Sequence, residues 1–420
     1  MYSDIFTRIE KGSAGPIGQY FDQAFGYYVY PRLEGELGPH MTFNGIQVLN
    51  WSLNDYLGLG NHPEVRKTDA EVAAKYGLAY PMGSRMLSGH TREHERLEKI
   101  FADFEKKEDA FLFNFGYQGI VSTVDALTGR HDVIVYDSES HACLLDGIRM
   151  HLGEKYKFRH NDMEHFERVI QRAVKKADEN GGGVLVITEG VFGMTGAMGK
   201  VAEIAAFKEK YPFRLLIDDA HGFGLMGKHG RGTSEEQNCM DGVDVYIAAF
   251  AKSMASIGGF VAGPKSIINY LRANLRSQMY AKSLPMVYVQ GNIKRMEIID
   301  SPEGDARRKK CKDITDAIQK GFLEAGFDIG EAEACVTPIH IKGGVAQATQ
   351  IAKDLRENYR IFCSIVVYPV IPQGMIIFRI VSTAAHSMED VNYTLNAFKE
   401  IKAKLEAGKY DDEIAAMTIE

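Results

Sequence analysis

The chain has 420 residues, of which 45% are hydrophobic and 25% are charged, and its formal net charge is -7. This is ordinary globular composition, and the acidic balance argues against a nucleic-acid-binding surface. No apolar segment is long enough to predict a signal peptide or a membrane span. We therefore expect a cytoplasmic protein with one large domain and one smaller domain.

The five cysteines are far apart, with no CxxC pair, and the 13 histidines show neither HExxH nor HxH spacing. These patterns predict neither a disulfide framework nor a metal site.

Short apolar runs alternate with amphipathic stretches through the first three quarters of the chain. The runs predict buried strands, and the stretches at about Asp162–Asn180 and Val201–Tyr211 predict helices. Such alternation is typical of an α/β fold with a mostly parallel sheet. The predicted strands are Val133–Tyr136, Val184–Ile187, Leu215–Ile217 and Val245–Ala248.

Polar residues follow each of these four runs. They are Asp137–His141, Glu189, Asp218–His221 and Lys252, in chain order. Because ligands bind beyond the carboxyl ends of parallel strands, we expect these residues to line one crevice.

The pattern changes after about residue 295. A charged stretch, Ser301–Lys310, opens a predicted helix that ends near Ala325, and a last helix is predicted at Met388–Leu405. Between them lie the predicted strands Val336–Ile341, Ser364–Ile371 and Met375–Val381. We predict an N-terminal segment at 1–55, a large domain at 56–295 and a smaller α+β domain at 296–420.

Lys252 lies just after a strand, among small residues and near a Gly-Gly pair, in the run AAFAKSMASIGGFVAG. A lysine that forms a Schiff base must be partly desolvated, and small neighbours let a flat ring approach. Asp218 follows the preceding strand, and a carboxylate there can keep a pyridine nitrogen protonated. Taken alone, the lysine also fits an inert surface residue, and Asp218-Asp219 fits a metal pair or a helix cap.

Together the two runs resemble the α-oxoamine synthase family of fold-type I pyridoxal-phosphate enzymes. That family includes serine palmitoyltransferase, 8-amino-7-oxononanoate synthase, 5-aminolevulinate synthase and 2-amino-3-ketobutyrate CoA ligase. Matching segments extend over nearly the whole chain. They are Leu49–Val65, Gly83–Glu98, Asp137–Met150, Thr188–Met194 and Phe378–Ser387.

The resemblance implies a fold-type I transferase with a seven-stranded, mostly parallel sheet and pyridoxal 5'-phosphate as cofactor. It implies that Lys252 binds the cofactor covalently and later moves the substrate α-proton. Asp218 would pair with the ring nitrogen, His221 would bind the phenolic oxygen, and His141 would stack on the ring. Glu189 matches too, with either a chemical or a structural role.

Other matches imply contacts at the edges of the site. Gly116 and Tyr117 would offer backbone amides to the phosphate, as a helix N-terminus does for an anion. Arg379 would take the amino-acid carboxylate by a two-pronged contact, with Asn54 nearby. His386 also matches, and its role stays open between chemistry and structure.

The chain departs from the family at four positions. Ala249 stands where the family has a phosphate-binding threonine, Gly193 where it has serine, and Thr195 lies where an acid is usual. The run containing Lys282 and Ser283 resembles one that reaches the phosphate of a neighbouring subunit, with Lys282 in place of a small residue. We hypothesise that Lys282 offsets the hydroxyl lost at residue 249 or faces an extra anionic group, such as a sulfonate, on the substrate.

The implied reaction condenses an amino acid with an acyl thioester and releases carbon dioxide and a thiol. The segments KSMASIGGFVAG and RSQMYAKSLP are most similar to serine palmitoyltransferase and favour L-serine with a long-chain acyl donor. L-cysteate, used for sulfonolipids, is the first alternative. The run EGDARR is closer to oxononanoate synthases, and 2-amino-3-ketobutyrate CoA ligase also stays open.

Two other classes remain, an aminotransferase and an inactive partner subunit, although the four site residues together argue against the second. The resemblance also implies a homodimer with shared active sites. The acyl carrier, coenzyme A or acyl carrier protein, stays open.

Overall fold

The computed structural model describes residues 4–11, 24–367, 371 and 374–411. Its largest element is a seven-stranded sheet with strand order β4-β10-β9-β8-β7-β5-β6. All strands run parallel except β10, which is antiparallel to both of its neighbours. The four predicted strands are confirmed as β5, β7, β8 and β9. The strand bounds are β4 Asp109–Phe113, β5 Val133–Asp137, β6 Glu154–Phe158, β7 Val184–Glu189, β8 Arg214–Asp218, β9 Val245–Ala249 and β10 Gly259–Gly263.

Successive residues of a strand point to opposite sides of the sheet, so these apolar strands present buried side chains on both faces. Helices cover both faces. On one face the core includes Val135 with residues of α5, α8, α9 and α13, and on the other it includes Ile134 with residues of α6, α7 and α11. The bounds are α5 Arg92–Phe104, α6 Gly116–Leu127, α7 Ala142–Met150, α8 Met163–Asn180, α9 Val201–Ala206, α10 Thr233–Glu236, α11 Lys265–Asn274, α12 Arg276–Met279 and α13 Met286–Ile299; short 3₁₀ turns occupy Phe207–Glu209 and Met240–Gly242.

Local signals set where the longer helices begin and end. Asp162 caps α8 by accepting the His165 amide, and the helix ends at Gly181, whose φ of 69° suits glycine. Ser301 caps the next long helix, α14, which has a proline in its first turn.

The C-terminal part is a second layer of helices on an antiparallel sheet of order β11-β14-β13. Its predicted elements are confirmed, except that the predicted strand Ser364–Ile371 is shorter in the structure, where β13 ends at Val366 and Val367 is no longer in a strand. Residues 368–370 of that prediction lie outside the described residues. The bounds are α14 Pro302–Glu324, β11 Val336–Lys342, α15 Val345–Glu357, β13 Ser364–Val366, β14 Met375–Val381 and α16 Met388–Glu406.

The N-terminal segment pairs with this second part. Strand β3 runs parallel to β12, with Leu49 opposite Ile361, and Trp51 lies in the same core cluster as Phe378. The remaining bounds are α1 Ile5–Lys11, β1 Leu33–Glu34, β2 His40–Phe43, β3 Ile46–Asn50, α4 Pro63–Tyr76 and β12 Ile361–Phe362. The domain boundaries at 55/56 and 295/296 stay a prediction.

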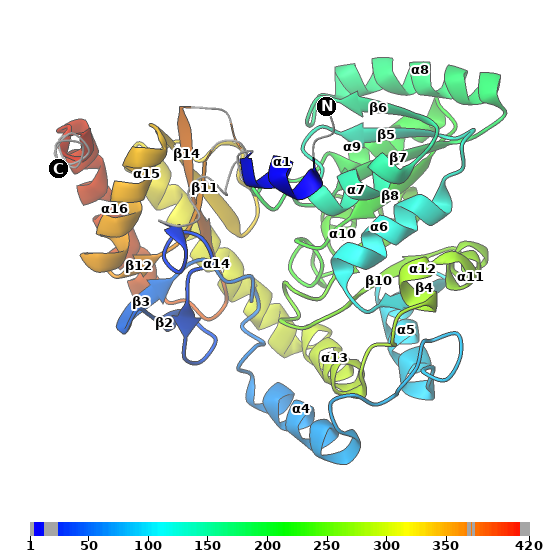
Figure 1. Ribbon diagram of the computed structural model, residues 1–420, viewed down its shortest axis with the longest axis horizontal. Helices are drawn as coiled ribbons and strands as arrows, with labels where there is room; N and C mark the ends of the chain where they lie inside the picture. The colour runs from blue at the N-terminus through cyan, green and yellow to red at the C-terminus, as the bar shows by residue number, and fades with distance from the viewer. Residues whose placement is uncertain (1–3, 12–23, 368–370, 372–373, 412–420) are drawn as a thin grey trace.

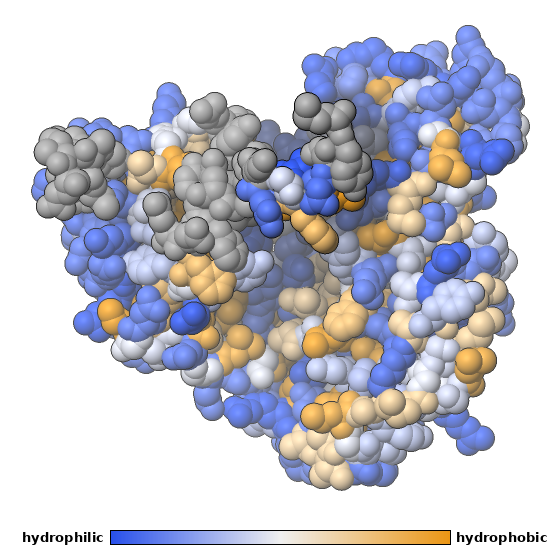
Figure 2. Space-filling view, in the orientation of Figure 1, coloured by the Kyte–Doolittle hydropathy of each residue, from blue (hydrophilic) through white to orange (hydrophobic). Residues whose placement is uncertain are grey.

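In Figure 1 the seven-stranded sheet lies on the right and the C-terminal strands on the left, with α13 and α14 running from one part to the other. The same face is hollowed between the two parts (Figure 2). Of the helices described, none has the length and apolar character to cross a membrane. Within the described ranges, no three His, Cys, Asp or Glu side chains gather in a way that could hold a metal ion.

Candidate active site

The residues predicted to line one crevice lie at the carboxyl ends of β5, β7, β8 and β9, which all run in one direction. Glu189 and Asp218 are the last residues of β7 and β8 and stand opposite each other in register. Lys252 follows the end of β9 by three residues. Four segments far apart in sequence therefore meet at one edge of the sheet, as the sequence predicted.

Lys252 is largely buried in a tight turn, where its carbonyl accepts the Ala255 amide. Burial lowers the pKa of its ammonium, and the nearby Asp218 carboxylate opposes that shift. A lysine with a depressed pKa reaches its neutral, nucleophilic form more easily. This is the environment that the sequence argument required.

The two adjacent acids have different surroundings. Asp219 is enclosed, because it accepts the amide and hydroxyl of Thr233 and the hydroxyl of Tyr246. Asp218 accepts the Ala220 amide at 3.1 Å and the thiol of Cys143 at 3.7 Å. Burial raises the pKa of Asp218, so a nearby cation would stabilise its charged form. Asp218 is therefore the acid of the pair that is left for a ligand.

His141 caps the N-terminus of α7, and its side chain is exposed at this edge of the sheet. Its amide donates to Glu189 at 2.5 Å, and its Nδ1 lies 2.9 Å from the sulfur of Cys143. Tyr117 packs edge-on against the ring with 6.3 Å between centroids. Glu189 thus has a structural contact in the site, which the sequence left open.

His221 is buried and faces two residues. Its Nδ1 lies 2.5 Å from the hydroxyl of Tyr56, and a Cβ placed on Gly193 would come within 2.3 Å of its Nε2. Burial lowers the pKa of His221, which keeps the ring neutral. Arg379 donates from Nε to the Gly193 carbonyl at 2.8 Å. Tyr56 was not singled out from the sequence, although it belongs to the matched segment that includes Asn54.

The N-terminus of α6 opens beside the end of β9. Its capping position, Phe115, makes no side-chain hydrogen bond to the helix, so the first amides are left for a ligand. A Cβ on Gly116 would lie 2.5 Å from the Cβ of Ala249. The glycine and the alanine therefore fit closely, and Tyr117 follows in the same first turn.

Two of the predicted site residues, Lys282 and Ser283, make no described contact with the other predicted site residues of the same chain. Lys282 and Ser283 share no hydrogen bond or ion pair with Lys252, Asp218 or the site histidines among the residues described. Lys282 is exposed, whereas the buried Ser283 hydroxyl has no described partner. The sequence placed both at a neighbouring subunit's site.

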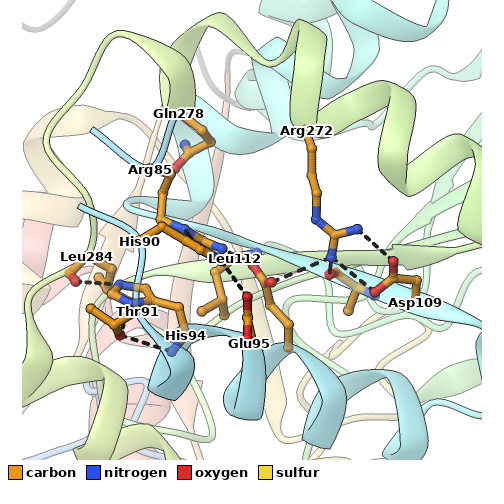
Figure 3. Close-up of polar contacts among 12 residues, drawn as sticks. Arg85, His90, Thr91, His94, Glu95, Asp109, Leu112, Arg272, Gln278 and Leu284 are labelled. Atoms are coloured by element: carbon orange, nitrogen blue, oxygen red, sulfur yellow. Dashed lines mark hydrogen bonds and ion pairs between the residues drawn. The ribbon is translucent and has the colours of Figure 1, made fainter. Parts of the chain in front are cut away.

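The segment that carries these two residues is held rigidly. The Asn114 side chain donates to the Lys282 carbonyl at 2.6 Å, and His94 binds the Leu284 carbonyl at 2.9 Å. Figure 3 shows His94 beside a polar network that includes Arg85 and His90. Arg85 also donates to Glu98 at 2.9 Å. This network fixes the loop that precedes α5 against the sheet.

The remaining two predicted residues, Asn54 and His386, differ in their surroundings. Asn54 has a buried side-chain oxygen without a described partner, which suits a residue that awaits a substrate. His386 is stacked on Trp51 at 3.8 Å and bonded to Thr383 and to the Asn50 carbonyl. His386 therefore holds the N-terminal segment against the C-terminal part.

These residues fit pyridoxal phosphate. Lys252 offers a partly desolvated amine, and Asp218 offers a buried carboxylate that no described Lys, Arg or His side chain pairs with. The α6 N-terminus, which has no side-chain cap, offers amides for a phosphate.

Comparisons with known proteins agree with this assignment. Residues 46–398 match the family model described as aminotransferase class I and II. The chain is 57% identical over 418 residues to a cysteate-C-fatty acyltransferase from Capnocytophaga ochracea, covering 99% of both chains. It is 32% identical to an 8-amino-7-oxononanoate synthase from Thermoanaerobacter pseudethanolicus, over 89% of this chain and 92% of that one.

Among solved structures, a Sphingomonas wittichii serine palmitoyltransferase superposes with a TM-score of 0.87 and 26% identity, over 97% of this chain and 99% of that one. The fold, the site and these relatives agree: the chain belongs to the aminotransferase class I and II family, and within it to the pyridoxal-phosphate-dependent acyltransferases called α-oxoamine synthases.

Proposed function

We propose that the chain condenses L-cysteate with a long-chain fatty acyl thioester, releasing carbon dioxide and the thiol and forming a 3-keto amino sulfonate. The observation that carries this proposal is the 57% identity, end to end, with a cysteate-C-fatty acyltransferase. L-serine, which the sequence motifs favoured, becomes the second candidate, supported by the likeness to serine palmitoyltransferase at 26% identity. A cytoplasmic location stays a prediction.

Lys252 would hold pyridoxal phosphate covalently and, once released by the amino acid, take the proton from its α-carbon. When bound, the cofactor supplies an electron sink for the negative charge that forms on this carbon. Asp218 would keep the ring nitrogen protonated, because an opposite charge stabilises the protonated form. The depressed pKa of Lys252 suits a group that must lose and regain a proton near neutral pH.

The two histidines would orient the ring. Burial raises the pKa of the Tyr56 phenol, so its hydroxyl is the donor to Nδ1 of His221. The neutral His221 ring then carries its proton on Nε2 and can donate to the phenolic oxygen. His141, exposed at the mouth of the site, would stack on the ring face and position the incoming substrate.

The amides of Gly116 and Tyr117 would bind the phosphate of the same chain. Ala249 offers no hydroxyl there, so Ser283 and Lys282 of a second subunit would complete the site. Homodimerisation is part of this proposal. It is supported by the exposed apolar side chains close to that segment, which are Leu78, Met82, Leu87 and Tyr280.

Arg379 and Asn54 would bind the substrate carboxylate. The cysteate sulfonate needs a further cation, and Lys282 is suited to this because no described carboxylate forms an ion pair with it. Slight desolvation lowers the pKa of this otherwise exposed ammonium, consistent with a charge that lacks a described ion-pair partner. Contact with the phosphate of the neighbouring subunit is the other possibility for the same residue.

The test of the reaction uses purified holoenzyme. L-cysteate, L-serine, glycine and L-alanine are added in turn while the visible absorbance of the cofactor is followed, and palmitoyl thioester is then supplied with a free-thiol assay. We expect the highest kcat/KM with L-cysteate. A higher kcat/KM with L-serine would overturn the substrate assignment, and a spectral change without thiol release from any pair would overturn the condensation.

The test of Lys282 compares Lys282→Ala with Lys310→Ala, which removes an exposed lysine from α14. If Lys282 binds the sulfonate, Lys282→Ala raises the KM for L-cysteate but not that for L-serine. If it binds phosphate, the Kd for pyridoxal phosphate rises instead. Both ideas are wrong if Lys282→Ala matches the Lys310→Ala control in both quantities.

A further inference from the structure

Cys143 connects two residues of the site that belong to different strand ends. It is the second residue of α7 and is 2% exposed. Its sulfur lies 2.9 Å from Nδ1 of His141 on one side and 3.7 Å from Oδ2 of Asp218 on the other. One thiol therefore touches both the residue proposed to lie on the ring face and the residue proposed at the ring nitrogen.

The hydrogen positions follow from the donors present. The backbone N–H of Cys143 donates to Nδ1 of His141 at 3.3 Å, so this nitrogen carries a lone pair and the neutral ring has its proton on Nε2. A carboxylate can only accept, and the thiol carries a single proton, so it donates that proton either to Asp218 or to Nδ1 of His141 and not to both at once. Burial, with Asp218 and Glu189 nearby, raises the pKa of the Cys143 thiol, which keeps that donor protonated.

The His141 ring has little else to hold it. Glu189 binds the backbone amide of His141 and not its ring. Tyr117 contacts the His141 ring edge-on, and its hydroxyl donates a hydrogen bond to Asp146 rather than to His141. In the described part of the chain, both polar contacts to the ring come from Cys143.

We propose that Cys143 is a positioning residue for the condensation: its thiol lies between Nδ1 of His141 and Oδ2 of Asp218 and, together with the Cys143 backbone N–H, holds the His141 ring with Nε2–H turned outward. The inference rests on the proposed function only where kcat and KM are measured. The Kd for pyridoxal phosphate is measured without either substrate and does not depend on that function. Serine at this position keeps a donor to His141, but its shorter side chain draws the oxygen away from Asp218. Alanine removes both thiol contacts and leaves the His141 ring only the backbone N–H of residue 143.

The experiment compares Cys143→Ala and Cys143→Ser with Cys363→Ala, a thiol that is equally buried at 3% exposure but lies in the C-terminal core. Apoenzyme is titrated with pyridoxal phosphate to obtain Kd, and kcat and KM are measured on the holoenzyme. The loss of one hydrogen bond corresponds to about 2- to 12-fold. We expect Cys143→Ala to raise Kd and lower kcat by that factor, Cys143→Ser to recover most of the loss, and Cys363→Ala to change neither quantity.

The proposal is overturned if Cys143→Ala matches Cys363→Ala in both Kd and kcat, or if Cys143→Ser is no better than Cys143→Ala. Should Cys143→Ala fail to fold, Cys143→Val fills the space without a donor and replaces it in the comparison. If the wild type releases no thiol with any substrate pair, the proposed function fails, while the Kd series still decides the role of Cys143.

Discussion

Replacing Tyr56 with phenylalanine tests how the site holds His221. Tyr56 is fully buried and its hydroxyl lies 2.5 Å from Nδ1 of His221, which is itself buried. Tyr56→Phe leaves that nitrogen without a donor and without water. An unsatisfied buried polar group costs about 1–3 kcal/mol, or about 5- to 150-fold in an equilibrium constant.

Part of this loss should appear in cofactor binding, because a free His221 ring can turn its Nε2 proton away from the ligand. We therefore expect a higher Kd for pyridoxal phosphate in apoenzyme titrations and a lower free energy of unfolding in urea. The matched control is Tyr246→Phe, which is equally buried and loses its 3.1 Å bond to Asp219, away from the site. If both variants bind the cofactor equally well, the reasoning about His221 is wrong.

Three further predictions follow from the same contacts. Gly193→Ala should lower the free energy of unfolding by about 1–3 kcal/mol in urea titrations, because its Cβ would overlap His221; an unchanged value contradicts this. Asp218→Asn should abolish the visible absorbance shift on adding an amino acid, whereas Asp219→Asn should retain it at a cost in stability, and the reverse result would exchange their roles. Burial lowers the pKa of His386 from 6.5 to about 4. As the pH falls, His386 is therefore protonated in the unfolded chain before it is protonated in the folded chain. The free energy of unfolding that it contributes is full above pH 6.5 and decreases below that pH. Relative to His386→Gln, the wild type should lose about 2 kcal/mol between pH 6.5 and pH 5; parallel profiles would refute this.

The residue pattern predicted four of the seven strands of the large sheet, β5, β7, β8 and β9, because they are short and apolar and are followed by polar residues of the site. It did not predict β4, β6 and β10. It could not predict contacts that depend on tertiary packing. The bond between Tyr56 and His221 joins residues 165 positions apart, and the enclosure of Asp219 depends on Thr233 and Tyr246. Local pattern alone therefore did not say which of the two adjacent acids is free.

Motif likeness also ranked the substrates differently from the whole chain. The segments around Lys252 and Lys282 are similar to serine palmitoyltransferase, yet identity over the full length favours the cysteate enzyme. This is expected physically, because the residues of a cofactor-binding segment are constrained by the cofactor that they contact, and the relatives share that cofactor. Substrate preference depends on scattered side chains that short motifs do not sample.

The parallel pairing of β3 with β12 has a consequence for biosynthesis. Leu49 leaves the ribosome about 300 residues before its partner Ile361, which at about 5–20 residues per second is a delay of about 15–60 s. During that interval β3 can pair with β2 and the large sheet can assemble, but Leu49 and Trp51 lack the C-terminal core in which they are buried. The apolar side chains of this segment therefore stay exposed until the C-terminal part has been made, and a chaperone can bind them there during synthesis.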